Sequence, residues 1–560
     1  MPESATPETH LAAGPWCFAG REELFPDWEE RFSFAPEPLG DHAARERAKQ
    51  HAWALTAHYL PRIGAHLNRA RGVDLPAAFW ETALMPSMLT VSQMLAERWL
   101  RTQALVEHWG KLPLRTTLLP EDCEFSFESD YERIKQGFQG YAYNHWLFSR
   151  FLAACQPSAW TVEILPPVRE HAIPPKPGLC SRLRAWARKV AYAPPFPHIK
   201  GFSPFQALAF SWALLGNRGQ ADCSVSLTEL MRQYAAPSIA GLRLPLDPWP
   251  IFLAAIPRCI LRAALPRQIK AAPRKRVRVA SVAAIQDTEY RLRLAAWRAA
   301  GHKLAFIQHG GNYGMLRCAA TTPLEEYCQH AFITWGWKRQ TPLWGNFVPL
   351  PHAQPAALYG AHRETDETLL FVGNGMELFP HRLDSRPAPT QFLEYRRMKA
   401  RFLSGLSPGI LAHAGYRPYF DVPAALSDWP WVQARFPMLE RSLGSLDAAM
   451  LACRLMVLDH HGTTLNLAFA ANTPLVLYWD ARAWELCPEG ESMLALLRGA
   501  GIWHPTPEEA AAAVERIWPD ARAWWQSDRV QSVRLRWCEQ FALSAGDGFN
   551  TQWMRALRTL

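Results

Sequence analysis

Short apolar segments alternate with helical segments in two separate blocks of this 560-residue chain. In the first block, Arg276–Ile285 predicts a strand, Asp287–Ala300 a helix and Lys303–Gln308 a second strand. A strand, a helix and a strand at this spacing form a parallel βαβ unit, because parallel strands need a long crossover connection. The chain is also too long for one hydrophobic core, so at least two domains are expected.

The alternation returns after a polar linker near residue 355. The predicted strands of this second block are Thr368–Val372, Gly409–His413, Arg454–Asp459 and Pro474–Tyr478. Its predicted helices are Thr390–Leu403, Leu443–Ala452 and Thr464–Ala471. Two such blocks predict an α/β protein with two Rossmann-like domains that face each other across a cleft.

Helical segments flank these blocks. Ala43–Leu67 and Phe79–Trp109 carry helical apolar patterns, and Pro507–Trp518 and Asp520–Leu543 predict two helices near the end. We therefore expect an N-terminal domain over 1–355, with a helical elaboration, and a nucleotide-binding domain over 356–510. The helices of 511–560 are expected to cross back to the first domain.

Charge and cysteine content set broad limits. Lys and Arg total 60 against 51 Asp and Glu, a mild excess that suits a phosphate-bearing partner without requiring one. Eleven Cys without a CxxC pair argue against a disulfide framework or a zinc site. The N-terminus shows no signal-peptide pattern and the chain has no long apolar run, so we expect a cytoplasmic protein. The basic stretch Arg182–Lys189 leaves peripheral contact with the inner membrane open, and nucleic acid is not expected as a partner.

The strongest local motif begins where the Lys303–Gln308 strand ends. It reads Gln308-His309-Gly310-Gly311-Asn312-Tyr313-Gly314. Ligands of open α/β sheets bind beyond the carboxyl ends of strands, and glycines allow the backbone to approach an anion closely. His309 is therefore a candidate proton acceptor in the cleft. The alternative is a glycine turn that carries a surface histidine.

The second motif follows the Arg454–Asp459 strand. Asp459, two histidines, Gly462, Thr463 and Thr464 precede a predicted helix that contains Asn466. Hydroxyls and backbone N–H groups at a helix N-terminus suit a phosphate. The alternative is that one threonine only caps the helix. The Asp-His-His run also occurs in certain phosphoesterases, but no second metal cluster accompanies it here, so we treat that match as coincidence.

Two lesser candidates lie in the same half. Gly373, Asn374 and Gly375 follow the first strand of the second block, where the first βα turn commonly meets a ligand. Arg417 could clamp a phosphate in a bidentate manner, although a lone arginine is more often a surface residue. The chain has no P-loop, no HExxH and no DxD motif, so neither a metal nor a resident cofactor is expected.

The chain resembles a family of transferases from bacterial O-antigen and surface-carbohydrate clusters, first defined in spirochaetes. The segments that carry the resemblance are Gly14–Phe18, Phe306–Gly314, Phe332–Trp337, Arg454–Asp480 and Trp524–Gln531. More distantly, the strand-end His-Gly and the Asp-x-x-Gly-Thr-Thr turn are similar to GT-B enzymes that use cytidine nucleotides, among them Kdo transferases and CDP-glycerol glycerophosphotransferases.

This resemblance implies a metal-independent GT-B glycosyltransferase of surface-polysaccharide synthesis. It implies that His309 activates the acceptor, that Thr463 and Thr464 hold the donor phosphate, and that Asn466 stands where relatives often place a ribose- or base-binding carboxylate. The implied partners are a nucleotide-sugar, CMP-linked or linked to another nucleotide, and a carbohydrate or lipid-linked carbohydrate acceptor. A CDP-glycerol-type phosphotransferase and a non-catalytic carbohydrate-assembly protein remain alternatives.

Overall fold

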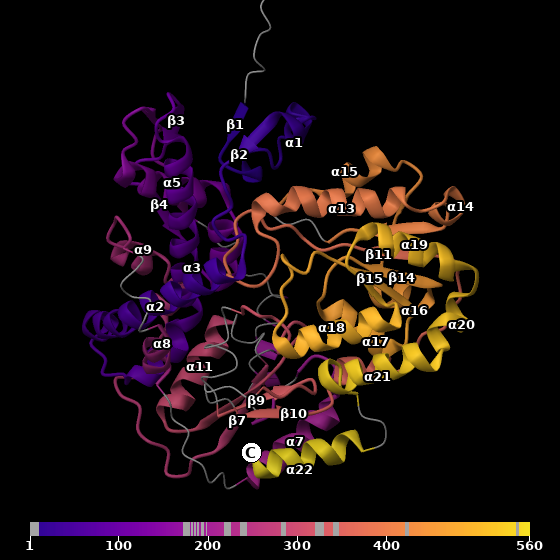
Figure 1. The fold of residues 1–560 in the computed structure, drawn as a ribbon. Coiled ribbons are helices and arrows are strands. Elements are labelled where there is room, and N and C mark those ends of the chain that lie inside the picture. Colours follow the sequence, from indigo (N-terminus) through magenta and orange to yellow (C-terminus); the bar gives the residue numbers. More distant parts are fainter. Residues whose placement is uncertain are drawn as a thin grey trace, which may run out of the picture.

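Two parallel β-sheets, one in each half of the chain, organise the molecule (Figure 1). The computed structural model of the protein describes residues 10–560 except 172–179, 181–182, 184–185, 188–189, 192–194, 198, 218–225, 236–242, 282–286, 320–329, 340–345, 420–424 and 545–547. Most of the basic stretch Arg182–Lys189 and the end of the predicted strand Arg276–Ile285 therefore lie outside the described residues. The predicted α/β class is confirmed, and the arrangement of two sheet-based lobes is GT-B-like.

The first lobe contains a sheet of four parallel strands in the order β10-β9-β8-β7. These strands are β7 (Val277–Ser281), β8 (Lys303–Ile307), β9 (Ala331–Thr334) and β10 (Phe347–Pro349). Alternate residues of β8 enter different cores, because successive side chains of a strand point to opposite faces. One face packs against α11 (Thr288–Ala299), and the other packs against α7 (Pro204–Leu215) and α22 (Phe549–Thr559).

The second lobe contains six parallel strands in the order β13-β12-β11-β14-β15-β16. They are β11 (Leu369–Val372), β12 (Ala414–Arg417), β13 (Glu440–Arg441), β14 (Leu455–Leu458), β15 (Leu475–Tyr478) and β16 (Trp503–His504). Ranked from one to six along the chain, they stand in the order 3-2-1-4-5-6. This is the strand order of Rossmann folds, and it places a crevice between β11 and β14, where the order reverses.

Helices cover both faces of this second sheet. One face packs against α17 (Thr463–Ala471), α18 (Pro488–Ala500) and α21 (Asp528–Phe541). The other packs against α13 (Phe392–Ser404), α15 (Asp428–Arg435) and α19 (Pro507–Ile517). The strands β11, β14 and β15 are buried on both faces, which explains why they are continuous apolar runs in the sequence.

Two boundaries predicted from the sequence are wrong. The expected strand Gly409–His413 overlaps a helical turn, α14 (Pro408–Leu411), and the strand begins only at Ala414. Pro408 follows an extended Ser407 and occupies the first helical position, where its fixed φ favours a helical start. The single helix expected over Asp520–Leu543 is divided into α20 (Ala521–Gln526) and α21, because the backbone of Ser527 is extended.

Long helices build the region before the first sheet, as predicted. They are α2 (His42–Arg71), α3 (Ala77–Trp109) and α5 (Tyr141–Cys155), and α3 packs against both α2 and α11. The shorter elements are β1 (His10–Ala12), α1 (Trp28–Arg31), β2 (Phe32–Phe34), β3 (Arg115–Leu118), β4 (Glu124–Ser126), α4 (Asp130–Glu132), β5 (Thr161–Ile164), β6 (Arg169–His171), α8 (Leu227–Ala235), α9 (Trp249–Ala254), α10 (Arg258–Arg262), α12 (Ala353–Leu358) and α16 (Leu446–Ala452).

Both ends of the described chain pack against the lobe that is distant in sequence. The N-terminal arm, residues 10–34, buries Trp16 and Phe18 against the second lobe, and Arg396 of α13 forms ion pairs with Glu22 and Glu29 at 3.1 and 2.8 Å. At the other end, α22 returns to the first lobe, where Trp553 Nε1 donates to the carbonyl of Pro351 at 2.8 Å. Among the described residues, no helix has both the length and the apolar character needed to cross a bilayer.

Candidate functional site

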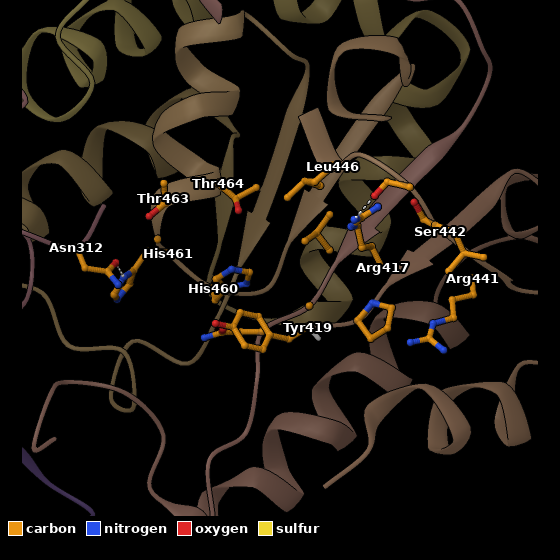
Figure 2. A pocket seen from close by; sticks show the side chains of 17 residues that line it. Asn312, Arg417, Tyr419, Arg441, Ser442, Leu446, His460, His461, Thr463 and Thr464 are labelled. Carbon is orange, nitrogen blue, oxygen red and sulfur yellow. Dashed lines mark hydrogen bonds between the residues drawn. The ribbon is translucent and has the colours of Figure 1, made fainter. Parts of the chain in front are cut away.

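The two turns singled out in the sequence contact each other across the cleft. The backbone N–H of Gly311 donates to Thr463 Oγ1 at 2.8 Å. A Cβ atom on Gly311 would lie 2.6 Å from the backbone of Gly462 and Thr463, so only glycine fits there. Asn312 Oδ1 accepts a hydrogen bond from His461 Nδ1 at 3.0 Å (Figure 2). The structure thus brings the two predicted motifs together on one side of the molecule.

Gln308 supports the first turn from inside the protein. Its side chain is buried, and Oε1 accepts hydrogen bonds from the Trp337 indole at 2.8 Å and from the Trp335 backbone at 3.0 Å. Its Nε2 donates to the carbonyl of Gly310 at 2.7 Å. Both tryptophans belong to the segment Phe332–Trp337. Gln308 therefore fixes the shape of the turn and does not face the cleft.

His309 is the exposed residue of this turn, whereas Asn312 and Tyr313 are half-buried. Its Nδ1 lies 3.0 Å from Tyr313 Oη. Surrounding protein desolvates the imidazole and, with a smaller contribution from the positive charge of Arg382, lowers the pKa of His309 to about 4. His309 is therefore neutral at pH 7, and when Nδ1–H donates to Tyr313, the lone pair of Nε2 is available to accept a proton.

A cavity of about 510 Å³ opens at the carboxyl ends of β11, β12 and β14 (Figure 2). We call it the donor cavity. Its lining residues are Asn312, Val372, Gly373, Asn374, Arg417, Pro418, Tyr419, Arg441, Ser442, Leu443, Gly444, Leu446, His460, His461, Gly462, Thr463 and Thr464. None of these described lining residues carries a carboxylate, and two are arginines, so the cavity favours an anion.

The N-terminus of α17 forms one wall of the donor cavity. Gly462 is the N-cap residue and no side chain caps the helix, so Thr463 and Thr464 are its first two residues and are not caps. The first N–H groups of a helix have no partner within the helix, and its dipole is positive at this end. Backbone amides and the Thr464 hydroxyl can therefore bind a phosphate here.

Arg417 forms the opposite wall. It is the last residue of β12, and its Nη2 donates to the carbonyl of Gly444 at 2.6 Å. Nη1 is buried and has no hydrogen-bond partner among the described residues. Arg417 lines the cavity, and its guanidinium charge favours an anionic ligand there.

Asp459 and His460 form a hydrogen-bonded pair behind the same cavity. Asp459 is buried and accepts from Tyr395 Oη at 2.7 Å and from His460 Nδ1 at 3.0 Å, and Lys399 Nζ lies 3.6 Å from its second oxygen. Asp459 does not line the donor cavity but orients His460, which does. The sequence interpretation missed His460; its place directly after a strand-end aspartate was the available signal.

Asn466 is placed differently from the sequence prediction. Its side chain is buried, and Oδ1 accepts from the indole N–H of Trp537 in α21 at 2.9 Å. Asn466 does not line the donor cavity. Instead, it provides the acceptor that the buried indole N–H of Trp537 needs. Gly373 does lie on the cavity wall, and a Cβ there would be 2.4 Å from Tyr416 Oη, so the close approach of Tyr416 requires glycine.

A second cavity of about 460 Å³ adjoins the first and shares Asn374 and Tyr419 with it. We call it the arm cavity, because the N-terminal arm forms one wall. Glu22, Glu23 and Asp428 bring carboxylates to this cavity, and Gly375 also lies there. The two cavities therefore differ in charge although they are neighbours. Within the described ranges, no three His, Cys, Asp or Glu side chains gather in a way that could hold a metal ion.

The fold and the site define a two-lobed GT-B-like protein with an anion-favouring cavity at the switch point of its second sheet. The chain belongs to the LIC12162 family of transferases, which it matches over residues 1–557. This confirms the family resemblance found in the five sequence segments. Among solved structures, the chain is similar to the spinosyn rhamnosyltransferase SpnG complexed with spinosyn aglycone, with a TM-score of 0.25, 11% identity and coverage of 79% of this chain and 97% of that chain. No curated protein matches the chain.

Proposed function

We propose that this protein is a glycosyltransferase that moves a sugar from a nucleotide-activated donor to a carbohydrate acceptor during bacterial surface-polysaccharide synthesis. The observation that carries this proposal is the donor cavity, which offers a helix N-terminus and two arginines but no carboxylate from its described lining. Membership of a transferase family supports group transfer as the type of reaction. A CMP-linked donor is our first choice of substrate.

The leaving nucleotide gains negative charge on its phosphate as the glycosidic bond to the donor breaks. In the proposed arrangement, the N–H groups that begin α17 and the Nη1 of Arg417 stabilise this charge. Thr464 adds a hydroxyl at the same wall. Thr463 contributes chiefly by holding the Gly311 backbone, because its oxygen already accepts that hydrogen bond.

His309 is the proposed general base. The acceptor hydroxyl oxygen attacks the anomeric carbon, its proton passes to His309 Nε2, and the nucleotide leaves with the electron pair of the broken C–O bond. Tyr313 positions the ring through Nδ1. His460, whose ring is oriented by Asp459, is the second candidate for this role.

The arm cavity is the proposed site for sugar hydroxyls. Carboxylates accept hydrogen bonds from hydroxyl groups, and Glu22, Glu23 and Asp428 bring three carboxylates to it. Asn374 and Tyr419 lie on both cavities and would contact the junction between sugar and phosphate. The proposed location is the cytoplasm, since all nine described cysteines are unpaired, as expected for a reducing compartment.

A nucleotide panel tests the function. Calorimetry with CMP, CDP, UDP and GDP is expected to show one preferred nucleotide, and the matching sugar donor is then supplied with a carbohydrate acceptor. A product heavier by one sugar supports glycosyl transfer, and a product heavier by a glycerol phosphate identifies the phosphotransferase alternative. Nucleotide binding without any turnover of donor would identify a non-catalytic assembly protein.

The base assignment has its own test. His309→Ala is expected to remove turnover while donor affinity stays nearly unchanged, and His108→Ala, an exposed histidine at the end of α3, serves as the control. Because the pKa of His309 lies near 4, kcat/KM is expected to stay level from neutral pH downward and to fall only as the pH approaches that value. Turnover that survives in His309→Ala and disappears in His460→Ala would transfer the role to His460.

A further inference from the structure

The helix α7 has an exposed apolar face. Phe205, Leu208, Trp212 and Leu215 are spaced to lie along one side of the helix, and Phe205 and Trp212 are 84% and 69% exposed. The opposite side, with Phe210 and Leu214, is buried against the sheet and against Trp553 of α22. This helix is therefore apolar on both its buried and its exposed sides.

An exposed row of large apolar side chains needs a physical explanation. Single exposed hydrophobic residues are common, but contiguous patches mark surfaces that bind something. Among the described residues, none covers these side chains. Earlier in the chain, Leu183, Trp186 and Val190 repeat the same spacing and are also exposed.

Charge identifies the kind of partner. Residues 171–221, which include α7, contain seven Lys and Arg and no Asp or Glu. Lys200 is exposed just before α7, and α22, which packs beside α7 (Figure 1), adds the exposed Arg555 and Arg558 and contains no acidic residue. Lys200, Arg555 and Arg558 thus make the described surface beside the exposed apolar face of α7 basic.

We propose that the exposed face of α7 docks the protein on a bilayer that contains anionic phospholipids. Trp and Phe side chains settle at the boundary between headgroups and acyl chains, while lysine and arginine contact lipid phosphates. A second copy of the same surface is a poorer partner, because two basic faces would repel each other. The helix has 12 residues and lies on the membrane without crossing it. This inference goes beyond the proposed reaction and does not depend on it.

Vesicle sedimentation tests the proposal with the full chain. The probes are vesicles of phosphatidylcholine alone and of phosphatidylcholine mixed with phosphatidylglycerol. The wild-type protein is expected to bind the mixed vesicles, and added salt is expected to weaken this binding. Phe205→Gln with Trp212→Gln is expected to reduce partitioning about tenfold or more, because both side chains would otherwise enter the apolar region.

Two further variants separate apolar from electrostatic contributions. Lys200→Glu with Arg555→Glu is expected to weaken binding to the mixed vesicles about tenfold and to leave binding to phosphatidylcholine unchanged. Met438→Gln with Leu535→Gln changes two exposed apolar residues of the second lobe and is expected to have no effect. Thermal unfolding confirms that each variant is folded.

Either of two results would overturn the proposal. One is equal vesicle binding by the wild type and the Phe205/Trp212 variant. The other is a wild type that ignores both vesicles but sediments as a dimer that this variant dissociates, which would assign the face to a contact between copies of the chain.

Discussion

The two turns that meet in the cleft differ in whether their polar groups are bound by the protein or open to a ligand. In the turn Gln308–Gly314, the side chains of Gln308, Asn312 and Tyr313 are engaged with protein groups. In the turn Gly462–Thr464, no side chain caps the helix, and the amides that begin α17 lie at the cavity wall. The first turn thus supports and positions, whereas the second offers its groups to a ligand. The difference shows that the site depends on both lobes although the cavity lies mostly in the second.

The contact between the turns is reinforced nearby. The Cys487 N–H donates to the Met315 carbonyl at 2.7 Å, and the Arg317 N–H donates to the Glu485 carbonyl at 3.2 Å. Backbone hydrogen bonds therefore join the lobes at this edge of the cleft. Any closing motion of the lobes must preserve or break these bonds. Substitution of Gly311 tests whether the two turns are in contact.

The largest effect is expected from Gly311→Ala. The added Cβ would lie 2.6 Å from the backbone of Gly462 and Thr463, which cannot move aside as a flexible side chain would. We expect a loss of about 3 kcal/mol in the free energy of unfolding and loss of nucleotide binding, because the two turns must separate. Denaturant unfolding and calorimetry measure the two quantities.

Gly499→Ala is the matched control for this variant. Gly499 lies inside α18, and a Cβ there would meet nothing within 4 Å. Alanine is the better helix former, so stability is expected to rise by up to about 1 kcal/mol. A Gly311→Ala protein as stable as the wild type would show that the turns are not in contact in solution.

An effect of nearly the same size is expected when the pH falls from 6 to 4. His461, which links the second turn to Asn312, is buried, and desolvation lowers its pKa to about 3. The unfolded chain takes up a proton near pH 6.5 and the folded protein does not, so stability is full above that pH and declines as the pH falls toward 3. The slope from this one group reaches about 1.4 kcal/mol per pH unit.

His461→Asn removes the titrating group while it keeps an N–H donor for Asn312. The decline of stability between pH 6 and pH 4 is then expected to be shallower by up to about 1.4 kcal/mol per pH unit. Unfolding in denaturant at a series of pH values measures this slope, with His108→Asn as the control. An unchanged slope in His461→Asn would mean that this side chain is accessible to water.

The smallest effects separate the two adjacent threonines. Thr463→Ala removes the acceptor of the Gly311 N–H and is expected to cost about 1 to 2 kcal/mol of stability, while Thr463→Ser restores most of it. Thr464→Ala is expected to leave stability within about 0.5 kcal/mol and to weaken nucleotide binding about fivefold. Thermal unfolding and calorimetry on the same samples measure both quantities. A stability loss in Thr464→Ala, with weaker nucleotide binding in Thr463→Ala alone, would contradict the comparison.

The sequence predicted the parts of the fold that local patterns determine. The strands β8, β11, β14 and β15 were located within one or two residues, because strands buried on both faces are plain apolar runs. The place of Arg417 was predicted wrongly. It is the last residue of β12 and does not lie after the strand, since the turn α14 shifts the start of the strand by five residues.

The candidate site was predicted only in part, for a similar reason. The strand-end positions of His309, Gly373 and Thr464 follow from the βα pattern, and the structure places Gly373 and Thr464, but not His309, on the wall of the donor cavity. The burial of Asn466 against Trp537 and the docking of the N-terminal arm depend on contacts between residues far apart in the chain. Such contacts leave no periodicity in one sequence.

The most direct test of the central claim, that the donor cavity binds the phosphate of a nucleotide, is the calorimetric dissociation constant of the preferred nucleotide for Arg417→Ala beside Arg482→Ala. Arg417 lines the cavity and its Nη1 has no hydrogen-bond partner among the described residues, whereas Arg482 is exposed and paired with Asp480. We expect Arg417→Ala to bind the nucleotide about tenfold to a hundredfold more weakly and Arg482→Ala to bind it as the wild type does. Equal affinity in both variants would contradict the account.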